Sequence, residues 1–191
     1  VMSICDAVVV GAGPAGLASA LALAGSGVDV ALVGPAAYRA SGERRTAALF
    51  PGSINALRNL GVWQAVAPAS AAMTGLRIID QTSAMLRGPQ VLFEARELGL
   101  EVLAYNVPNL ALVEALEDAV AAHPRIARPS HALAAAVEIE ADRVTVRQQD
   151  GTDITARMAA AADGKSSTAR SAAGIAVQTW AYEQTAIAAS F

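Results

Sequence analysis

Several side chains that carry chemistry or cross-link small folds are scarce in this sequence. Its 191 residues include one cysteine, Cys5, which excludes an internal disulfide, and two histidines, neither of which is spaced with other ligands as a metal site requires. Aromatic residues amount to 4%, and the 14 basic residues are too scattered to favour a nucleic-acid surface. Cys5 lies in an apolar stretch, which indicates a buried thiol in a reducing, cytoplasmic compartment. We therefore expect no metal and no nucleic-acid partner.

Charge is also missing from a long stretch near the start of the chain, between Asp6 and Asp29. Such a run is long enough to span a bilayer, but a lipid-exposed turn within it would leave backbone polar groups without partners. Glycine and proline interrupt the run at Gly11, Gly13, Pro14, Gly16, Gly25 and Gly27. No basic region precedes it, as a signal peptide would require. We expect a strand, a turn and a buried helix here, and no transmembrane segment.

The apolar content, 54% of the chain, is sufficient for a sizeable core. Residues 7–10 predict a buried strand, a helix is expected from Pro14 to Ala24, and a second strand is expected from Val28 to Val33. Between the first strand and the helix lies a G-x-G-x-x-G pattern, which consists of Gly11, Ala12, Gly13, Pro14, Ala15 and Gly16. Its glycines permit a tight turn, close approach of a pyrophosphate and close helix packing. This context favours a dinucleotide-binding loop over a purely structural glycine turn.

An acidic residue is missing where such a loop usually has one, at the end of the second strand. Gly34 occupies that place, Pro35 follows, and no Asp or Glu occurs between Asp29 and Glu43. One hydrogen bond to the adenosine ribose is therefore absent, or is supplied by water or backbone. Such a loss costs about 0.5–1.5 kcal/mol, which weakens cofactor binding without excluding it. Because glycine offers no basic group to a 2′-phosphate, NADP is not favoured in this loop.

The middle of the chain alternates between helical and strand patterns. Residues 36–50 suggest a loop, 51–67 a helix, 75–81 and 91–95 two strands, 102–120 a strand followed by a helix, and the stretch before Ala162 a three-stranded meander. The two inserted strands suggest a second, antiparallel sheet. Together these patterns predict an α/β fold in which a Rossmann-like parallel sheet, with a β-meander crossover, is joined by part of an antiparallel sheet.

A second signature follows the last strand of the meander, from Asp163 to Arg170, with the sequence DGKSSTAR. Asp163 and Gly164 come at the carboxyl end of an apolar strand, and in open α/β sheets that edge holds ligands. Ser167 and Arg170 are expected in the helical turn that follows, where Arg170 could clamp the loop or meet a phosphate. The alternative is that Asp163 serves as a helix cap.

The order of these motifs resembles a known family. The glycine-rich loop, "ERRTAAL" with "LRNLGVWQAV", "YNVPNLALVEAL", "AADGKSSTAR", "AGI" and "YEQTAIAAS" occur along essentially the whole chain. In this order they resemble the N-terminal part of the FAD-dependent aromatic hydroxylases of the p-hydroxybenzoate hydroxylase type, and among these most nearly the ubiquinone-biosynthesis hydroxylases. The family's later G-D motif, which closes the flavin site, is not found in this sequence, so we expect an N-terminal part that is inactive by itself.

The resemblance implies roles for particular residues. Gly11, Gly13 and Gly16 would hold the FAD pyrophosphate together with Pro14 and Ala15, while Gly34 departs from the family's usual acid. Arg45 would lie near the FAD, and Asn109, at the start of a helix, would touch it. Asp163, Gly164, Ser167 and Arg170 match the D-G-x-x-S-x-x-R motif, which is implicated in FAD and NAD(P)H handling. No residue that would deprotonate a phenol can be named.

The resemblance also implies an activity and a division into domains. The expected function is hydroxylation of a phenolic or quinone-precursor ring with FAD, NAD(P)H and O₂. A prenylated substrate would imply peripheral contact with a membrane. The alternatives are another flavoenzyme of this fold, such as a halogenase or an isoprenoid reductase, and a non-catalytic nucleotide-binding module. The expected FAD-binding parts are residues 1–72 and 101–175, and the expected substrate-domain parts are 73–100 and 176–191.

Overall fold

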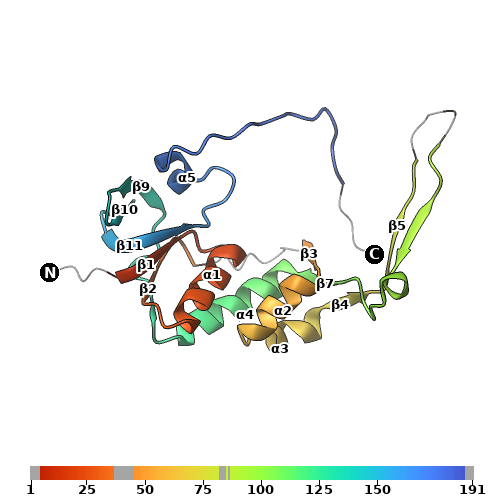
Figure 1. Cartoon of the computed structure of the whole chain (residues 1–191), viewed down its shortest axis with the longest axis horizontal. Coiled ribbons are helices and arrows are strands. Elements are labelled where there is room, and N and C mark those ends of the chain that lie inside the picture. Colours follow the sequence, from red (N-terminus) through yellow and green to blue (C-terminus); the bar gives the residue numbers. More distant parts are fainter. Residues whose placement is uncertain (1–4, 37–44, 82–84, 86, 188–191) are drawn as a thin grey trace.

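A six-stranded sheet in which the first strand lies near the centre organises the chain (Figure 1). The computed structural model describes residues 5–36, 45–81, 85 and 87–187. The order across the sheet is β8 (Ile126–Ala127), β2 (Val30–Val33), β1 (Cys5–Val10), β11 (Asp153–Ala161), β10 (Val144–Gln148) and β9 (Ala134–Ile139). The first four strands run parallel, whereas β10 and β9 continue the sheet antiparallel. The predicted parallel sheet with a meander is confirmed.

Both faces of the central strands are buried, which is why these strands are continuously apolar. Val8 and Val9 are each 0% exposed although they point to opposite faces. Val9 packs in the core beneath the helices, and Val8 packs in a second core between the sheet and the α5 helix (Thr168–Ala172). Cys5, at the start of β1, is only partly buried, and this burial raises the pKa of its thiol.

Two helices cover one face of the sheet and meet each other there. The α1 helix (Pro14–Gly25) follows the glycine-rich loop, and α4 (Asn109–Ala122) follows β7 (Ala104–Pro108). The buried residues of α4 recur every four positions, at Leu112, Leu116 and Val120, and therefore form one stripe. This stripe packs in the same core as Leu17 of α1. None of the helices in the described ranges has the length and apolar character needed to cross a membrane.

The helix expected over residues 51–67 is divided in the structure. It consists of α2 (Pro51–Asn59), α3 (Trp63–Val66) and the short 3₁₀ turn η1 (Ala67–Ala69). Gly61, with φ of 72°, ends the first helix because its left-handed backbone breaks the helical path. Trp63 then packs edge-on against Tyr105 of β7, with ring centroids 5.0 Å apart. The break therefore turns an aromatic side chain into the core.

A second, three-stranded sheet has the order β3 (Thr46–Leu49), β7 and β4 (Ala71–Met73). The expectation of a loop throughout residues 36–50 is wrong for β3, which pairs antiparallel with β7 from Thr46 opposite Pro108 to Leu49 opposite Tyr105. The partner strand lies far along the sequence, so the local pattern of small residues does not reveal the pairing. The remainder of that expected loop, residues 37–44, lies outside the described residues.

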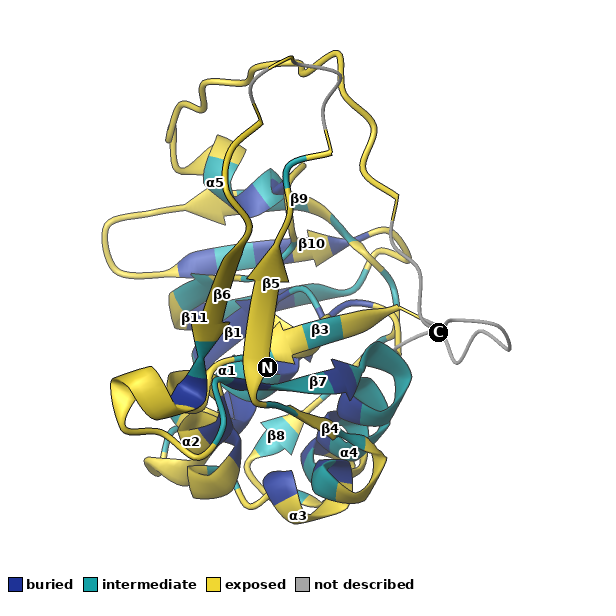
Figure 2. Ribbon diagram, turned by 90° about the vertical axis from the view of Figure 1, so that its right-hand side faces the viewer, coloured by how far each residue is buried: buried dark blue, intermediate teal, exposed yellow. Residues whose placement is uncertain are grey.

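A two-stranded hairpin extends away from the rest of the molecule (Figures 1 and 2). It consists of β5 (Gly75–Ile78) and β6 (Val91–Glu94), with the short turn η2 (Ala95–Leu98) after it. The predicted antiparallel pairing is confirmed, with Ile78 opposite Val91. From residue 173 to residue 187 the described chain forms no helix or strand. The expected domain boundaries, including a substrate-domain sheet from residue 176, stay a prediction.

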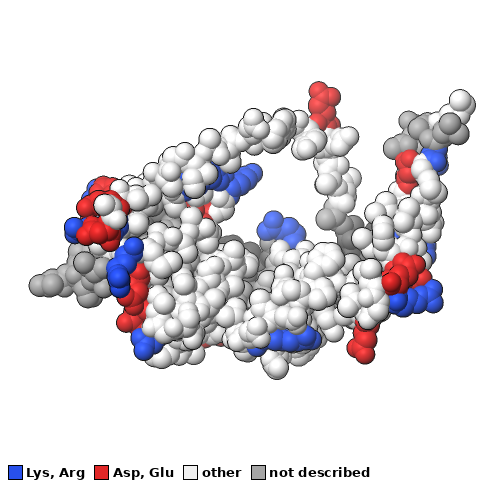
Figure 3. All heavy atoms as spheres, in the orientation of Figure 1, with Lys and Arg blue, Asp and Glu red and all other residues white. Residues whose placement is uncertain are grey.

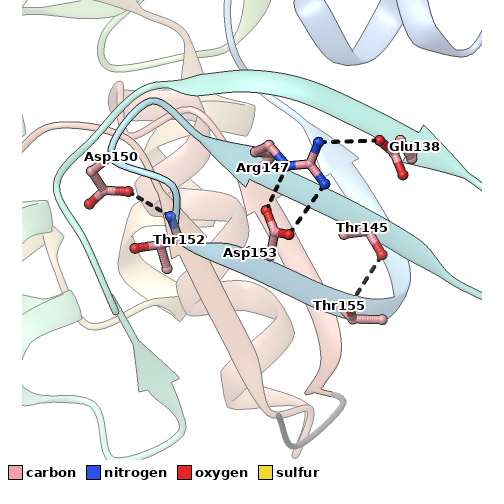
Figure 4. A network of polar contacts seen from close by, with 7 residues as sticks. All are labelled: Glu138, Thr145, Arg147, Asp150, Thr152, Asp153 and Thr155. Atoms are coloured by element: carbon pink, nitrogen blue, oxygen red, sulfur yellow. Dashed lines mark hydrogen bonds and ion pairs between the residues drawn. The ribbon is translucent and has the colours of Figure 1, made fainter.

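Polar side chains pair across the meander (Figure 4). The Arg147 guanidinium on β10 lies 3.1 Å from Asp153 on β11 and 3.8 Å from Glu138 on β9. The hydroxyls of Thr145 on β10 and Thr155 on β11 lie 3.2 Å apart. Because Arg147 is about half exposed, its ion pairs add little stability. They agree with the register of the three strands, in which Arg147 lies opposite Asp153.

Truncation of Leu116 tests the α1–α4 core. This side chain is 1% exposed, so Leu116→Ala should lower the free energy of unfolding by about 2–5 kcal/mol through lost burial and a residual cavity. Urea unfolding followed by circular dichroism measures the change. Leu133→Ala, at a position 53% exposed, is the matched control and should cost less than about 1 kcal/mol. Equal losses in the two variants would contradict this account of the core.

Candidate dinucleotide site

The glycine-rich loop leaves β1 and enters α1 at the carboxyl edge of the sheet, and two of its glycines are required by crowding. Gly11 has φ of 107°, and a Cβ there would lie 2.3 Å from the carbonyl oxygen of Ala162. A Cβ on Gly16 would lie 1.8 Å from the carbonyl oxygen of Gly11. Both distances are far below any real contact, so no larger side chain fits without moving the backbone. The predicted roles of the first and third glycines, turn formation and close packing, are confirmed.

The middle of the same loop is open. A Cβ on Gly13 would meet nothing within 4 Å, and Gly13, Pro14 and Ala15 are exposed. Gly13 is the N-cap of α1, Pro14 begins the helix, and no side chain caps this end. The first backbone N–H groups of a helix have no partner within it, and the helix dipole adds positive potential there. The loop therefore presents amide donors to an anion such as a diphosphate.

The second signature lies beside this loop. The β1 and β11 strands are parallel neighbours, and the N–H of Ala162 donates to the carbonyl oxygen of Val10 at 2.7 Å. The backbone nitrogen of Asp163 lies 2.7 Å from the place where a Cβ on Gly11 would sit. Two motifs from opposite ends of the chain therefore meet at one edge of the sheet. The sequence-based expectation that they face a common site agrees with this geometry.

Hydrogen bonds within the second signature give its loop a defined shape. The Asp163 carboxylate accepts from the Ser167 hydroxyl at 2.5 Å and from the N–H of Ala169 at 3.1 Å. Ser167, which is 5% exposed, is the N-cap of α5 and accepts from the N–H of Arg170 at 2.9 Å. Partial burial acts to raise the pKa of Asp163, but the hydrogen bonds from Ser167 and from backbone amides lower it overall. These hydrogen bonds therefore favour the ionised form of Asp163.

Arg170 closes this loop from the other side. Its guanidinium donates to the carbonyl oxygen of Lys165 at 2.9 Å, across the turn in which Gly164 has φ of 83°. The interpretation that Arg170 clamps the loop is confirmed, and Asp163 acts as the capping side chain that the alternative interpretation described. Direct contact of Asp163, Gly164, Ser167 or Arg170 with a cofactor stays a prediction.

Two further predicted residues, Arg45 and Asn109, lie next to each other. The N–H of Asn109, at the start of α4, donates to the carbonyl oxygen of Arg45, just before β3, at 3.0 Å. The pairing of β3 with β7 produces this contact. Figure 3 shows basic side chains on both sides of the hollow between the chain that leaves α5 and the body of the molecule. Contact of Arg45 and Asn109 with the cofactor also stays a prediction.

Gly34 ends β2 against the same loop. It is buried, its φ is 133°, and a Cβ there would lie 3.0 Å from the backbone nitrogen of Ala12. Sequence reasoning did not single out Ala12 and Ala162, the small residues that let these backbones approach. Alanine is so abundant in this chain that their size carries no signal by itself. Only the contacts identify them.

The fold and this loop define a dinucleotide-binding α/β protein, and comparisons with known proteins identify the family. Residues 4–190 match the family described as FAD binding domain. The chain belongs to this FAD-binding monooxygenase family. The family explains why the loop glycines, the DG edge and the parallel sheet occur together.

Relatives of known name agree with this assignment. The chain is 34% identical over 182 residues to 3-demethoxyubiquinol 3-hydroxylase of Escherichia coli, covering 92% of this chain and 45% of that protein. It is 30% identical to Ubiquinone hydroxylase UbiL of Rhodospirillum rubrum, covering 96% of this chain and 43% of that protein. The crystal structure of p-nitrophenol 4-monooxygenase PnpA from Pseudomonas putida matches with a TM-score of 0.74 at 20% identity, covering 91% and 44% of the two chains, and so supports the fold. The chain spans about half the length of the relatives it matches.

The residues present fit the diphosphate of FAD. Gly13 leaves open space where a side chain would stand, and the uncapped end of α1 supplies donors without a competing carboxylate in its first turn. Asp163, the acidic residue of the second signature, already accepts hydrogen bonds with both of its carboxylate oxygens. The pyrophosphate would therefore face backbone amides rather than an unpaired negative charge.

A single methyl group at Gly16 should disrupt this loop. Gly16→Ala places a Cβ against the Gly11 carbonyl oxygen, so the loop or the start of α1 must shift. We expect a melting temperature lower by at least about 4 °C, measured by differential scanning fluorimetry. Gly25→Ala, at the other end of α1 with nothing within 4 Å of the new Cβ, is the control and should not lower the melting temperature. An unchanged Gly16→Ala protein would contradict the crowding.

The Ser167 hydroxyl should matter both to stability and to its pH dependence. Ser167→Ala removes the N-cap of α5 and a hydrogen bond to Asp163, so the free energy of unfolding at pH 7 should fall by about 1–2 kcal/mol.

The sign of the pH effect follows from the lowered pKa of Asp163. A carboxyl whose pKa is lowered by folding adds stability above its unfolded pKa of about 4 and loses it as the pH falls further. Without Ser167 the pKa shift shrinks, so the wild-type protein should lose more stability than the variant between pH 7 and about pH 3. Urea unfolding at both pH values measures this. Ser19→Ala is the control, because it removes a hydroxyl that donates to the Ala15 carbonyl oxygen on α1, away from Asp163. This variant should lose as much stability as the wild-type protein between the two pH values.

Proposed function

We propose that the protein to which this chain belongs is an FAD-dependent monooxygenase that hydroxylates a phenolic or quinone-precursor ring with NAD(P)H and O₂. The observation that carries the proposal is the meeting of the glycine-rich loop with the DG edge in a chain of the FAD-binding monooxygenase family. The names of the two relatives, a demethoxyubiquinol hydroxylase and a ubiquinone hydroxylase, support the substrate class.

The part of this chain in the reaction is to bind and orient the cofactor. The amides at the start of α1 would donate to the FAD pyrophosphate, and the exposed Gly13 would let it approach the backbone closely. Arg45, Asn109 and the loop from Asp163 to Arg170 would line the adjoining part of the site. Bound FAD would supply the redox chemistry that no side chain here can provide.

The substrate and the place where the protein meets it are proposals about the whole protein, not about this chain alone. Because the chain spans about half the length of its relatives, residues outside it would complete the site. A prenylated quinone precursor is apolar, so we propose peripheral contact of the whole protein with a membrane surface on the cytoplasmic side.

Retention of FAD tests the cofactor assignment. The chain is mixed with excess FAD and desalted, and we expect absorbance near 450 nm to elute with the protein. Gly16→Ala should retain much less, because its loop cannot keep the same shape. Absence of retained FAD in both the chain and the full-length gene product would contradict the proposal and favour a non-catalytic nucleotide-binding module.

Turnover of the full-length gene product tests the reaction class. NADH and NADPH oxidation are followed at 340 nm with and without a panel of phenols, and product analysis identifies the added oxygen. We expect a phenol to stimulate oxidation severalfold and to gain one hydroxyl group. FAD binding without hydroxylation of any phenol would refute the hydroxylase and favour another flavoenzyme of this fold, such as a halogenase or an isoprenoid reductase.

A further inference from the structure

Two described segments that would face the adenosine ribose, residues 10–18 and 30–36, contain no polar side chain. The end of β1, the loop and the start of α1 (residues 10–18) consist of glycine, alanine, valine, leucine and proline. The end of β2 and the two residues that follow Gly34 (residues 30–36) are equally apolar. Within these two described segments only backbone groups can form hydrogen bonds with a nucleotide.

The glycine at position 34 is required by the backbone and by its neighbours. With φ of 133°, Gly34 has a conformation that residues with a side chain rarely adopt. A Cβ would also lie 3.0 Å from the nitrogen and 3.3 Å from the Cβ of Ala12, which belongs to the glycine-rich loop. A carboxylate at the end of β2 would therefore strain β2 and push against the loop that cradles the diphosphate.

Gly27, in the turn between α1 and β2, allows the backbone strain to be tested separately from the crowding against Ala12. Its φ is 92°, but a Cβ there would meet nothing within 4 Å. A substitution at Gly27 thus strains the backbone without touching the loop, whereas one at Gly34 does both.

We propose that this chain recognises the adenosine diphosphate half of its cofactor through the diphosphate, with no side-chain acceptor for the ribose hydroxyls in the glycine-rich loop or at the end of β2, and so does not discriminate between ribose and 2′-deoxyribose. The inference rests on the proposed function, since it concerns the same dinucleotide site. Its physical basis is that the 2′-hydroxyl is usually held by an acid at the end of β2, and that an acid at Gly34 would be strained by the backbone and crowded by Ala12. The ligand class is a diphosphate nucleotide with either ribose or 2′-deoxyribose.

Calorimetric titration of the chain with three nucleotides tests the proposal. ADP and 2′-deoxy-ADP should bind with dissociation constants within about twofold of each other, since a hydroxyl without a charged partner contributes little. AMP, which lacks the diphosphate, should bind at least about tenfold more weakly, as expected where backbone amides at a helix N-terminus hold the ligand.

Each outcome of this titration bears on a different claim. Binding of 2′-deoxy-ADP about tenfold more weakly than ADP would overturn the inference, because a hydrogen bond to a charged acceptor has that magnitude, and would leave the FAD site intact. Equal binding of AMP and ADP would also overturn it. No binding of any of the three, together with no retention of FAD by either the chain or the full-length gene product, would remove the proposed function itself.

Substitution at Gly34 provides a second test. Gly34→Glu restores the usual acid in the sequence, yet we expect no gain in ADP affinity and a melting temperature lower by at least about 2 °C. Gly34→Ala adds the crowding against Ala12 without adding a charge. It should therefore weaken ADP binding. Gly27→Ala is the control, and should lower the melting temperature while leaving ADP affinity within about twofold.

A Gly34→Glu protein that binds ADP about tenfold more tightly and prefers it to 2′-deoxy-ADP would refute the crowding of an acid at this position, while the wild-type titration still decides the inference. If Gly34→Glu does not fold, Gly34→Ala and the wild-type titration still decide the question. A Gly34→Ala protein with wild-type melting temperature and wild-type ADP affinity would refute the crowding against Ala12.

Discussion

The parallel pairing of β1 with β11 is the constraint on which the site depends. Val10 lies opposite Ala161 in the register, and the next two backbones, at Gly11 and Ala162, are so close that no Cβ fits between them. This approach brings the start of the chain and its last helical turn to one edge of the sheet. If β11 paired elsewhere, the glycine-rich loop would lose the Asp163 edge that now lies beside it.

The meander and the helices both serve this pairing. Pairing with β10 and β9 covers the other edge of β11, and a shift of β11 by one residue against β1 would reverse the faces of its side chains. On the other side, α1 and α4 bury the sheet with a stripe of leucine and valine, which leaves the α1 N-terminus at the carboxyl edge. The resulting site consists mainly of backbone, and its few polar side chains, such as Ser167 and Arg170, shape a loop. The proposed recognition through the diphosphate fits this composition.

Much of this fold could be predicted from local patterns. The strand, glycine-rich loop and helix at the start have continuous apolar residues, defined glycines and a proline in the first helical turn, and all of these act over a few residues. The meander follows from its turn residues, and the two strands of the hairpin follow from their apolar segments. The β3 strand could not be predicted because its only signal is its distant partner β7, and the division of the helix over residues 51–67 depends on the left-handed Gly61 and on the packing of Trp63 against Tyr105.

The sequence by itself determined the presence of the dinucleotide loop, the DG signature and the absence of an acid at the end of the second strand, because each is a matter of residue type and order. The tertiary structure alone decided that the two signatures meet, that Asp163 caps α5, and that Gly34 lies against Ala12 in a conformation that residues with a side chain rarely adopt. The reason is physical. Residue types set what each segment can form locally, whereas the space left around a backbone atom depends on segments that only the packed sheet brings together.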